Sequence, residues 1–413
     1  MYKIAVVLLV AAVFCVDAFG LAMNLYPLRL VLPIAFMYAL AAFIQRFVVE
    51  KNELNLPVVL FLSFLFFVYS FIHTSVVSGL YYYLEGREYP IADVANYTVH
   101  FLLVSTLFLL SLLDLKRFFQ LAIKASAVFY VLYFLFAIFE MKTGYHLPVS
   151  NMVDAAAWKG NVPTVVFHNS NDFASVFTML FVFLFCQMKT PATLINQALF
   201  VFLIIGQLYI LYITQSRLSL LVFALFVLYK YPKKLLIIGG LSGVFLLGSG
   251  YLAESSFYLK LISSVDKLLA DLSFGERGSS MVRIALYKHA LLSAQEYLGM
   301  GHGINASLEY YRSVTDPNLH YITNPHSFFF EILINSGVIV AFLYIILNVY
   351  LIVQNWLVKN YDLIAQLIIY NLLLFSSSSS LFLWPIYLFF FLYVIQLSLS
   401  QLKSKQNKEL CSC

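Results

Sequence analysis

Residues 327–354 read SFFFEILINSGVIVAFLYIILNVYLIVQ, an apolar run in which Glu331 is the one charged side chain. The run is longer than the roughly 20 helical residues that cross the hydrocarbon core of a bilayer. Asn324 and Pro325 come directly before it, after the one long polar segment of the chain, and they predict a helix start with Asn324 as N-cap and Pro325 as the first helical residue. The sequence therefore predicts a transmembrane helix with His326 in its first turn.

The rest of the chain repeats this apolar character. Hydrophobic residues make up 62% of the sequence and charged residues only 11%, whereas soluble domains have about 25% charged residues. No run alternates apolar and polar residues in the manner of a strand, so we expect an all-α, polytopic membrane protein. Twelve spans are predicted, over 4–20, 28–45, 57–73, 94–113, 121–141, 172–187, 194–213, 216–229, 235–252, 327–354, 363–375 and 381–400.

Lysine and arginine positions predict the orientation. With the amino terminus inside, 14 of the 25 Lys and Arg residues fall in inner segments and five in short outer segments, while six lie in the long loop 253–325. The positive-inside rule then puts both termini in the cytoplasm and this loop outside, with 4–20 as an uncleaved first span. The net charge of +5 reflects this bias, so we do not expect a nucleic-acid partner.

The loop 253–325 carries patterns of its own. An apolar stripe at helical spacing over 257–272 predicts one helix. A second is expected over 281–298, where Gly and Pro are absent and Ser279 or Ser280 can act as N-cap. We therefore expect one membrane domain, 1–413, with an inserted extracytoplasmic loop that forms a lid over an outward cavity.

Arg217 opens an unusually short apolar run. The apolar span 216–229 reaches only to Tyr229 before Lys230, and its 14 residues cover about 21 Å at about 1.5 Å each, less than the core thickness of about 30 Å. Arg217 is therefore predicted to lie below the outer surface, at the bottom of a wet vestibule. An intramembrane arginine usually has a partner, so the alternative is an ion-paired or snorkelling side chain at a helix end.

Arg283 and His326 are both predicted near helix amino termini. The helix dipole disfavours a cation there by about 0.3–1 kcal/mol, which suggests an anionic partner for Arg283, although an exposed first-turn arginine is the simpler alternative. The same dipole favours a neutral His326 that can accept a proton. A purely structural histidine is the alternative.

Taken together, these positions resemble a known family. The stretches concerned are Thr214-Gln215-Ser216-Arg217, Arg283 with Gly299-Met300-Gly301-His302-Gly303, and His326-Ser327 followed by Gly337. They are similar to motifs of the O-antigen ligase and Wzy-type polymerase superfamily of bacterial cell-surface polysaccharide assembly, and 167–174 is similar to a further motif. The resemblance covers about 163–340. Asn335 and Val340 differ from the glutamate and glycine that family members often have.

The resemblance implies a GT-C-like glycosyltransferase that acts on an undecaprenyl-diphosphate-linked glycan. Arg217 and Arg283 would bind the diphosphate, because arginine meets phosphate oxygens bidentately and stays charged. His326 would orient or deprotonate the acceptor hydroxyl as general base. The sequence contains no Asp-x-Asp, so we expect no metal, no nucleotide-sugar donor and no cofactor.

The implied partners are a lipid-linked glycan donor, a glycan or lipid-linked glycan acceptor and membrane lipid, with a flippase and a chain-length regulator as candidate protein partners. The implied location is the outer face of the cytoplasmic membrane, in capsule or exopolysaccharide synthesis. Candidates for lining the sugar site are His168, Asn169, Asn171, Asp172, Gly301, His302, Gly303 and Tyr321. For 168–172 a polar turn with an N-cap is equally plausible, and a tight turn explains the glycines better than an anion-binding nest.

Several functions stay open at this point. A Wzy-type polymerase joins repeat units, whereas a ligase passes finished glycan to another acceptor, and the sequence does not separate the two. A polysaccharide or small-solute transporter would also use a polar vestibule with an intramembrane arginine. Inverted repeats and paired broken helices, which transport would favour, are not evident in the sequence.

Overall fold

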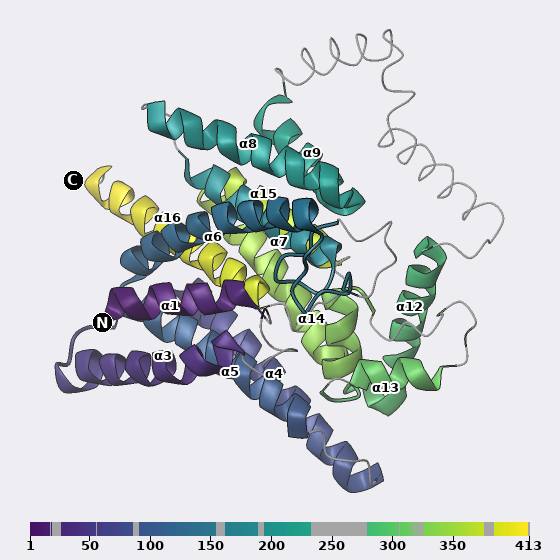
Figure 1. The fold of residues 1–413 in the computed structure, drawn as a ribbon. Coiled ribbons are helices and arrows are strands. Elements are labelled where there is room, and N and C mark those ends of the chain that lie inside the picture. Colours follow the sequence, from purple (N-terminus) through teal and green to yellow (C-terminus); the bar gives the residue numbers. More distant parts are fainter. Residues whose placement is uncertain are drawn as a thin grey trace.

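The computed structural model describes residues 1–16, 18, 26–54, 56–85, 91–153, 162–188, 194–232, 279–304, 306–314, 316, 319, 325–375 and 384–411. Throughout these residues every regular element is a helix (Figure 1). The α-helices are α1 (Tyr2–Cys15), α3 (Pro27–Phe43), α4 (Val58–Glu85), α5 (Ile91–Leu113), α6 (Leu115–Thr143), α7 (Ser170–Gln187), α8 (Leu194–Thr214), α9 (Arg217–Lys230), α12 (Ser279–Ser293), α13 (Ala306–Ser313), α14 (Phe328–Leu357), α15 (Tyr361–Phe375) and α16 (Pro385–Cys411).

The all-α, polytopic membrane fold is confirmed. Among the described residues, eight helices are long and apolar enough to cross a membrane, and these are α3, α4, α5, α6, α7, α8, α14 and α16. Helices α1 and α15 are apolar but shorter. Eleven of the twelve predicted runs coincide with helices, while the run 235–252 lies outside the described residues. The count of twelve spans therefore stays a prediction.

Helix α16 forms the centre of the bundle. It packs against α1, α4, α5, α6, α7 and α15, and in Figure 1 it runs from the middle of the molecule to the end where the termini lie. Its side chains from Ile386 to Ile395 are at most 2% exposed, as expected of a helix that is apolar on all sides. Aromatic rings contact it from two sides, with Phe14 of α1 and Phe183 of α7 both against Phe389.

The two ends of the bundle differ in character. Both chain termini lie at one end, and α12 and α13 lie at the other (Figure 1). At the terminal end the Tyr2 hydroxyl donates to the carbonyl oxygen of Leu110 at 2.9 Å, and the Asn360 amide donates to the Ser400 hydroxyl at 3.2 Å. Termini on one side and loop helices on the other are what the charge distribution predicts, and the assignment of the terminal side to the cytoplasm remains a prediction.

The helices of the segment 253–325 differ in part from the expectation. The second predicted loop helix is present as α12, but it ends at Ser293 and a short 3₁₀ turn follows over Glu296–Gly299. Helix α13 was not predicted. The first predicted loop helix, over 257–272, lies outside the described residues.

Candidate functional site

The polar motif before α7 is built around a helix cap. The Asn169 side-chain oxygen accepts hydrogen bonds from the backbone N–H groups of Asn171 and Asp172 at 2.9 and 3.0 Å, and its amide donates to the Asp172 carboxylate at 2.6 Å. Asp172 is buried, whereas His168 and Asn171 are exposed. The predicted capping alternative is thus realised by Asn169 and Asp172, and His168 and Asn171 are the members of this motif that present their side chains outward.

A buried carboxylate holds the segment that leads into α7. Glu140, fully buried near the end of α6, accepts the backbone N–H groups of Thr164 and Val165 at 2.9 and 2.7 Å and contacts His146 Nδ1 at 3.2 Å. The His168 ring contacts the carbonyl oxygen of Val149 at 3.1 Å. These contacts fix the segment that leads into α7.

Arg217 begins α9, as the length of its apolar run predicts. The preceding Gln215 has a φ of 52°, a left-handed conformation that is uncommon outside glycine, and buried Ser216 is the N-cap. Ring pairs between Phe181 and Phe223 (5.3 Å) and between Phe185 and Phe226 (5.4 Å) make α7 and α9 parallel neighbours. Arg217 therefore lies at the same end of the bundle as Asp172.

The guanidinium group of Arg217 is exposed. Within the part of the chain that the structure describes, it makes no hydrogen bond or ion pair. The predicted ion-paired alternative is therefore not seen among these residues, and the group is available to an anionic ligand.

Arg283 is carried to the start of α14 by aromatic packing. Tyr287, one turn further along α12, stacks on Phe330 with ring centroids 4.4 Å apart, and its hydroxyl donates to the carbonyl oxygen of Phe375 at 3.3 Å. Burial raises the pKa of Tyr287, and the nearby charge of Arg283 opposes that rise. Arg283 is half-buried. Because Phe330 is four residues beyond His326, the stack brings Arg283 and His326 to one region.

Helix α13 joins the same region. The Tyr311 hydroxyl donates to the carbonyl oxygen of Leu286 at 2.7 Å, which ties α13 to α12. Burial, and then the neighbouring Tyr310 and Glu331, raise the pKa of Tyr311. Glu331 is only 4% exposed, so a carboxyl group on the first turn of α14 lies beneath these tyrosines.

His326 lies outside the helix, contrary to the prediction. Helix α14 begins at Phe328 with Ser327 as N-cap, and His326 has a φ of 51°. A left-handed residue cannot continue into a right-handed helix, so the chain turns at His326 rather than at Pro325. Such a backbone costs about 1–3 kcal/mol and is held by its surroundings. The prediction that His326 lies in the first turn of the helix is therefore wrong.

Ser327 adds a buried polar atom beside His326. Its side chain is fully buried, its hydroxyl makes no capping hydrogen bond, and it has no partner among the described residues. A buried hydroxyl without a partner costs about 1–3 kcal/mol in a folded protein.

The stretch Gly299-Met300-Gly301-His302-Gly303, called the glycine motif below, has a packing role. The backbone N–H groups of His302 and Gly303 donate to the carbonyl oxygens of Ile334 and Asn335 at 2.7 and 3.0 Å. The N–H of Gly303 is thus engaged within the protein, and the anion-nest alternative for Gly299, Gly301 and Gly303 loses this donor. Gly301, His302 and Gly303 are buried.

The partner of this motif is a kink in α14. Gly337 has a φ of 82° and a ψ of −178° inside the helix, and a Cβ atom added to Gly301 would lie 2.5 Å from the Gly337 backbone nitrogen. A Cβ on Gly337 would in turn lie 2.3 Å from the carbonyl oxygen of Gly299. The two backbones touch, which only glycine on both sides permits.

Helix α4 closes this junction, and sequence reasoning missed it. His73 Nε2 contacts the carbonyl oxygen of Met300 at 3.2 Å, and the hydroxyls of Thr74 and Ser336 are 2.7 Å apart. The Ser78 hydroxyl accepts the backbone N–H of Ile304 at 2.6 Å. The signal was available as hydroxyl residues spaced by three or four along one face of an apolar helix.

The structure therefore groups some of the predicted residues. Arg283, His326 and the glycine motif converge on the first half of α14, while Arg217 and 168–172 lie on neighbouring helices at the same end of the bundle. Tyr321 lies outside the described residues. Among the described residues no group of three or more His, Cys, Asp or Glu side chains is arranged to hold a metal ion.

The sequence of this membrane protein matches a known family over the part that carries most of the candidate site. Residues 199–345 match the family model of the O-antigen ligase, Wzy_C. The match includes Arg217, Arg283, the glycine motif and His326, and 168–172 lie before it. It confirms the predicted relationship to the O-antigen ligase and polymerase superfamily.

A relative supports the same relationship. The chain is 29% identical over 221 residues to the teichuronic acid biosynthesis protein TuaE of Bacillus subtilis (strain 168), which is 51% of this chain and 44% of the relative. The aligned region is thus less than half the length of that protein. No solved structure matches the chain. The chain is accordingly a multi-pass membrane protein that is similar to proteins of polysaccharide assembly.

Proposed function

We propose that the protein is a glycosyltransferase that polymerises undecaprenyl-diphosphate-linked repeat units at the outer face of the cytoplasmic membrane. The observation that carries this proposal is the convergence at the start of α14. The Tyr287–Phe330 stack brings Arg283 to the segment that holds His326, and Arg217 extends an exposed guanidinium at the same end of the bundle.

The reaction assigns a role to each of these groups. The acceptor hydroxyl oxygen attacks the anomeric carbon of the donor sugar, and the bond from that carbon to the diphosphate oxygen breaks. The hydroxyl proton passes to His326, which acts as general base. The electron pair leaves with the lipid diphosphate, whose negative charge Arg217 and Arg283 stabilise. In this scheme the arginines and the amino-terminal ends of the helices provide the positive charge, so neither a metal nor a nucleotide is required.

The half-buried setting of His326 and Arg283 supports this assignment. Charge-assisted hydrogen bonds strengthen where water is partly excluded, and a ligand anion would offset the partial burial of the Arg283 guanidinium. The left-handed backbone at His326 is a further mark of a site where the chain is held in a particular arrangement.

The first experiment measures transfer by the purified full-length protein. The donor is the lipid-diphosphate repeat unit, in buffer with a chelator and no nucleotide, and lengthened glycan is scored. We expect Arg217→Ala and Arg283→Ala each to lower turnover about 10- to 100-fold, the value of a charged hydrogen bond of about 1.5–3 kcal/mol. Arg29→Ala is a control, because Arg29 contacts Asn96 of α5 and Tyr26 just before α3, both outside the site. Unchanged turnover in both site variants would contradict the diphosphate assignment.

A ligase is the second candidate, because the matching family model is described as the O-antigen ligase. The same residues serve both reactions, and the acceptor differs. A polymerase converts one lipid-linked repeat unit into a ladder of products on the same lipid. A ligase gives a single transfer to a separate acceptor and no ladder.

A further inference from the structure

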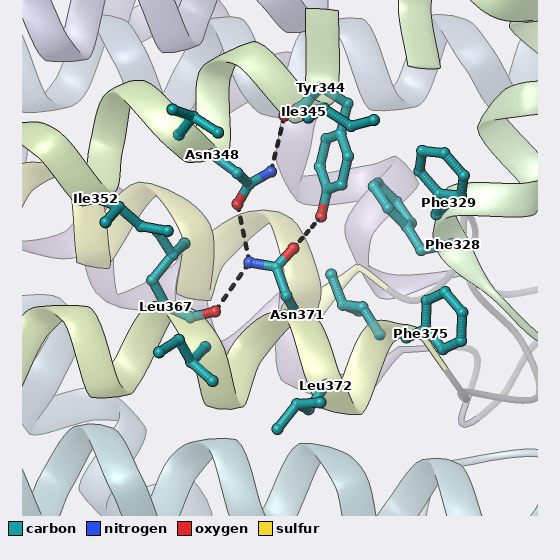
Figure 2. Close-up of a pocket in the computed structure, with 13 residues that line it drawn as sticks. Phe328, Phe329, Tyr344, Ile345, Asn348, Ile352, Leu367, Asn371, Leu372 and Phe375 are labelled. Atoms are coloured by element: carbon teal, nitrogen blue, oxygen red, sulfur yellow. Dashed lines mark hydrogen bonds between the residues drawn. The ribbon is translucent and has the colours of Figure 1, made fainter. Parts of the chain in front are cut away.

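A groove runs between α14 and α15 on the outside of the bundle. It has a volume of about 480 Å³, and Figure 2 shows its wall as phenylalanine rings at one end and aliphatic side chains beyond them. Phe328, Phe329 and Phe375 form the aromatic end. Val349 and Ile368 line it further along and are 54% and 48% exposed, so the groove opens to the surroundings of the bundle, which for these spans is lipid.

Polar side chains tie the two helices together across the groove. The Tyr344 hydroxyl donates to the Asn371 side-chain oxygen at 2.6 Å, and the Asn371 amide donates to the Asn348 oxygen at 2.8 Å and to the carbonyl oxygen of Leu367 at 2.8 Å. The Asn348 amide donates to the carbonyl oxygen of Tyr344 at 2.9 Å (Figure 2). Each amide is satisfied internally, as a membrane setting demands. The network links α14 to α15 while leaving an apolar wall for a chain to contact.

The aromatic end of the groove is continuous with the candidate active site. Phe328 follows His326 and Ser327 directly. On the opposite wall, the carbonyl oxygen of Phe375 accepts the hydroxyl of Tyr287, one turn from Arg283. A hydrocarbon chain attached to a diphosphate at Arg283 would therefore enter the groove beside Phe375.

We propose that this groove binds the polyprenyl tail of the lipid-linked donor. The inference rests on the proposed function, because it takes the diphosphate to be held at Arg283. It goes further by naming the wall that receives the tail. An apolar chain gains from contact with the groove by dispersion and close packing, since lipid and tail are similarly apolar. The gain is specific only for a chain whose head is anchored at the site, and this distinguishes the donor from a phospholipid that covers the groove in passing.

Photolabelling tests the proposal without relying on turnover. The full-length protein in nanodiscs of phosphatidylglycerol and phosphatidylethanolamine is given undecaprenyl diphosphate with a diazirine near the far end of its tail. We expect label on peptides covering 344–352 and 367–375 at least tenfold above peptides of the exposed face of α3. Unlabelled undecaprenyl diphosphate should remove this label, and added phosphatidylglycerol should not. Even labelling of all lipid-facing helices, or equal competition by phosphatidylglycerol, would overturn the proposal.

A matched pair of variants tests the tail's contribution to transfer. Ile345 lines the groove and Ile346 does not, and both are 46% exposed. Ile345→Trp fills the groove, so we expect the KM for the undecaprenyl donor to rise at least tenfold, with no change for a donor whose tail has two isoprene units. Ile346→Trp should change neither KM. Equal effects of the two tryptophans, or an equal loss with long and short tails, would contradict the groove assignment.

The two proposals fail in different ways. A wild-type protein that binds the photoprobe in the groove but transfers no glycan would refute the glycosyltransferase and retain the tail site. A protein that transfers glycan while the label is spread evenly would retain the enzyme and refute the groove. If Ile345→Trp does not accumulate in the membrane, the labelling of the wild-type protein decides the matter.

Discussion

The contact between the glycine motif and the kink in α14 gives the sharpest structural prediction, for Gly301→Ala. The added Cβ would lie 2.5 Å from the backbone nitrogen of Gly337 and 2.7 Å from the carbonyl oxygen of Asn335. Neither atom belongs to a flexible side chain, so the two backbones must separate. Gly301 also has a φ of 89°, which other residues rarely adopt.

The magnitude follows from these two effects. A left-handed backbone costs a residue with a Cβ about 1–2 kcal/mol, and overpacking costs about 1–3 kcal/mol, so the local contact should weaken by about 2–5 kcal/mol. At about 1.4 kcal/mol per factor of ten, opening becomes about 30-fold or more easier. Hydrogen exchange measures this directly, because the amides of His302 and Gly303 donate across the contact. We expect both amides to exchange at least about 30-fold faster in the variant.

Gly79→Ala is the matched control. An added Cβ on Gly79 meets no atom within 4 Å, and the residue lies in α4, next to Ser78 of the same junction. Alanine is favoured over glycine inside a helix by about 1 kcal/mol, so the substitution should not weaken α4. Because the added Cβ also displaces nothing, the exchange rates of the amides of 302 and 303 should stay unchanged. Equal protection of these amides in the wild type and in Gly301→Ala would refute the account of the glycine motif.

Three further predictions concern single side chains. Tyr287→Leu removes a ring stack and a hydrogen bond worth about 1–3 kcal/mol together, so hydrogen exchange in α12 should become faster and the KM for the donor should rise. Tyr287→Phe keeps the stack on Phe330, so its exchange rates should lie between those of the wild type and of Tyr287→Leu. Identical exchange in all three proteins would contradict the packing. Asn169→Ala removes the cap of α7 and should destabilise its first turn by about 0.5–2 kcal/mol. Hydrogen exchange of the Asp172 amide measures this loss, and unaltered protection of that amide would exclude the cap. Ser327→Ala removes a buried hydroxyl without a described partner, so the thermal stability of the purified protein should stay the same or rise, and a clear fall would mean that the hydroxyl is hydrogen-bonded.

The helices could be predicted because their signal is local. Hydropathy alone locates α5, α6 and α14 to within several residues, since crossing a bilayer requires a long apolar run. It also locates the start of α4, but this helix continues to Glu85, well past the predicted end at residue 73. The start of α14 could not be predicted in the same way. Asn-Pro is a strong helix-start signal, but the left-handed backbone of His326 delays the helix to Phe328, and that conformation is imposed by neighbours rather than by local propensity.

The site could be predicted in its residues and only partly in its geometry. The charges and dipole arguments singled out Arg217, Arg283 and His326, and the structure brings Arg283 to the start of α14. It does so through Tyr287, which stacks on Phe330. This ring pair could not be predicted from the sequence, because the chain contains so many aromatic residues.

The glycine junction illustrates the same limit. Gly301 and Gly337 are far apart in sequence, and each alone is consistent with a turn or a helix-packing position. Their direct backbone contact exists only once α14 has kinked and the segment with Gly301 packs against the kink. The short helix α13 was missed for a related reason, because its Tyr311 is stabilised by a hydrogen bond to α12 rather than by a long periodic pattern.

The central claim is that His326 takes a proton during metal-independent glycosyl transfer from a lipid diphosphate. The most direct measurement is the single-turnover rate of transfer by His326→Asn in the presence of a chelator, with binding of the undecaprenyl diphosphate probe measured in parallel. Asparagine tolerates the left-handed backbone at this position but cannot act as a base. The account predicts a rate about 100- to 10,000-fold below that of the wild type with probe binding retained. A rate close to that of the wild type would contradict it.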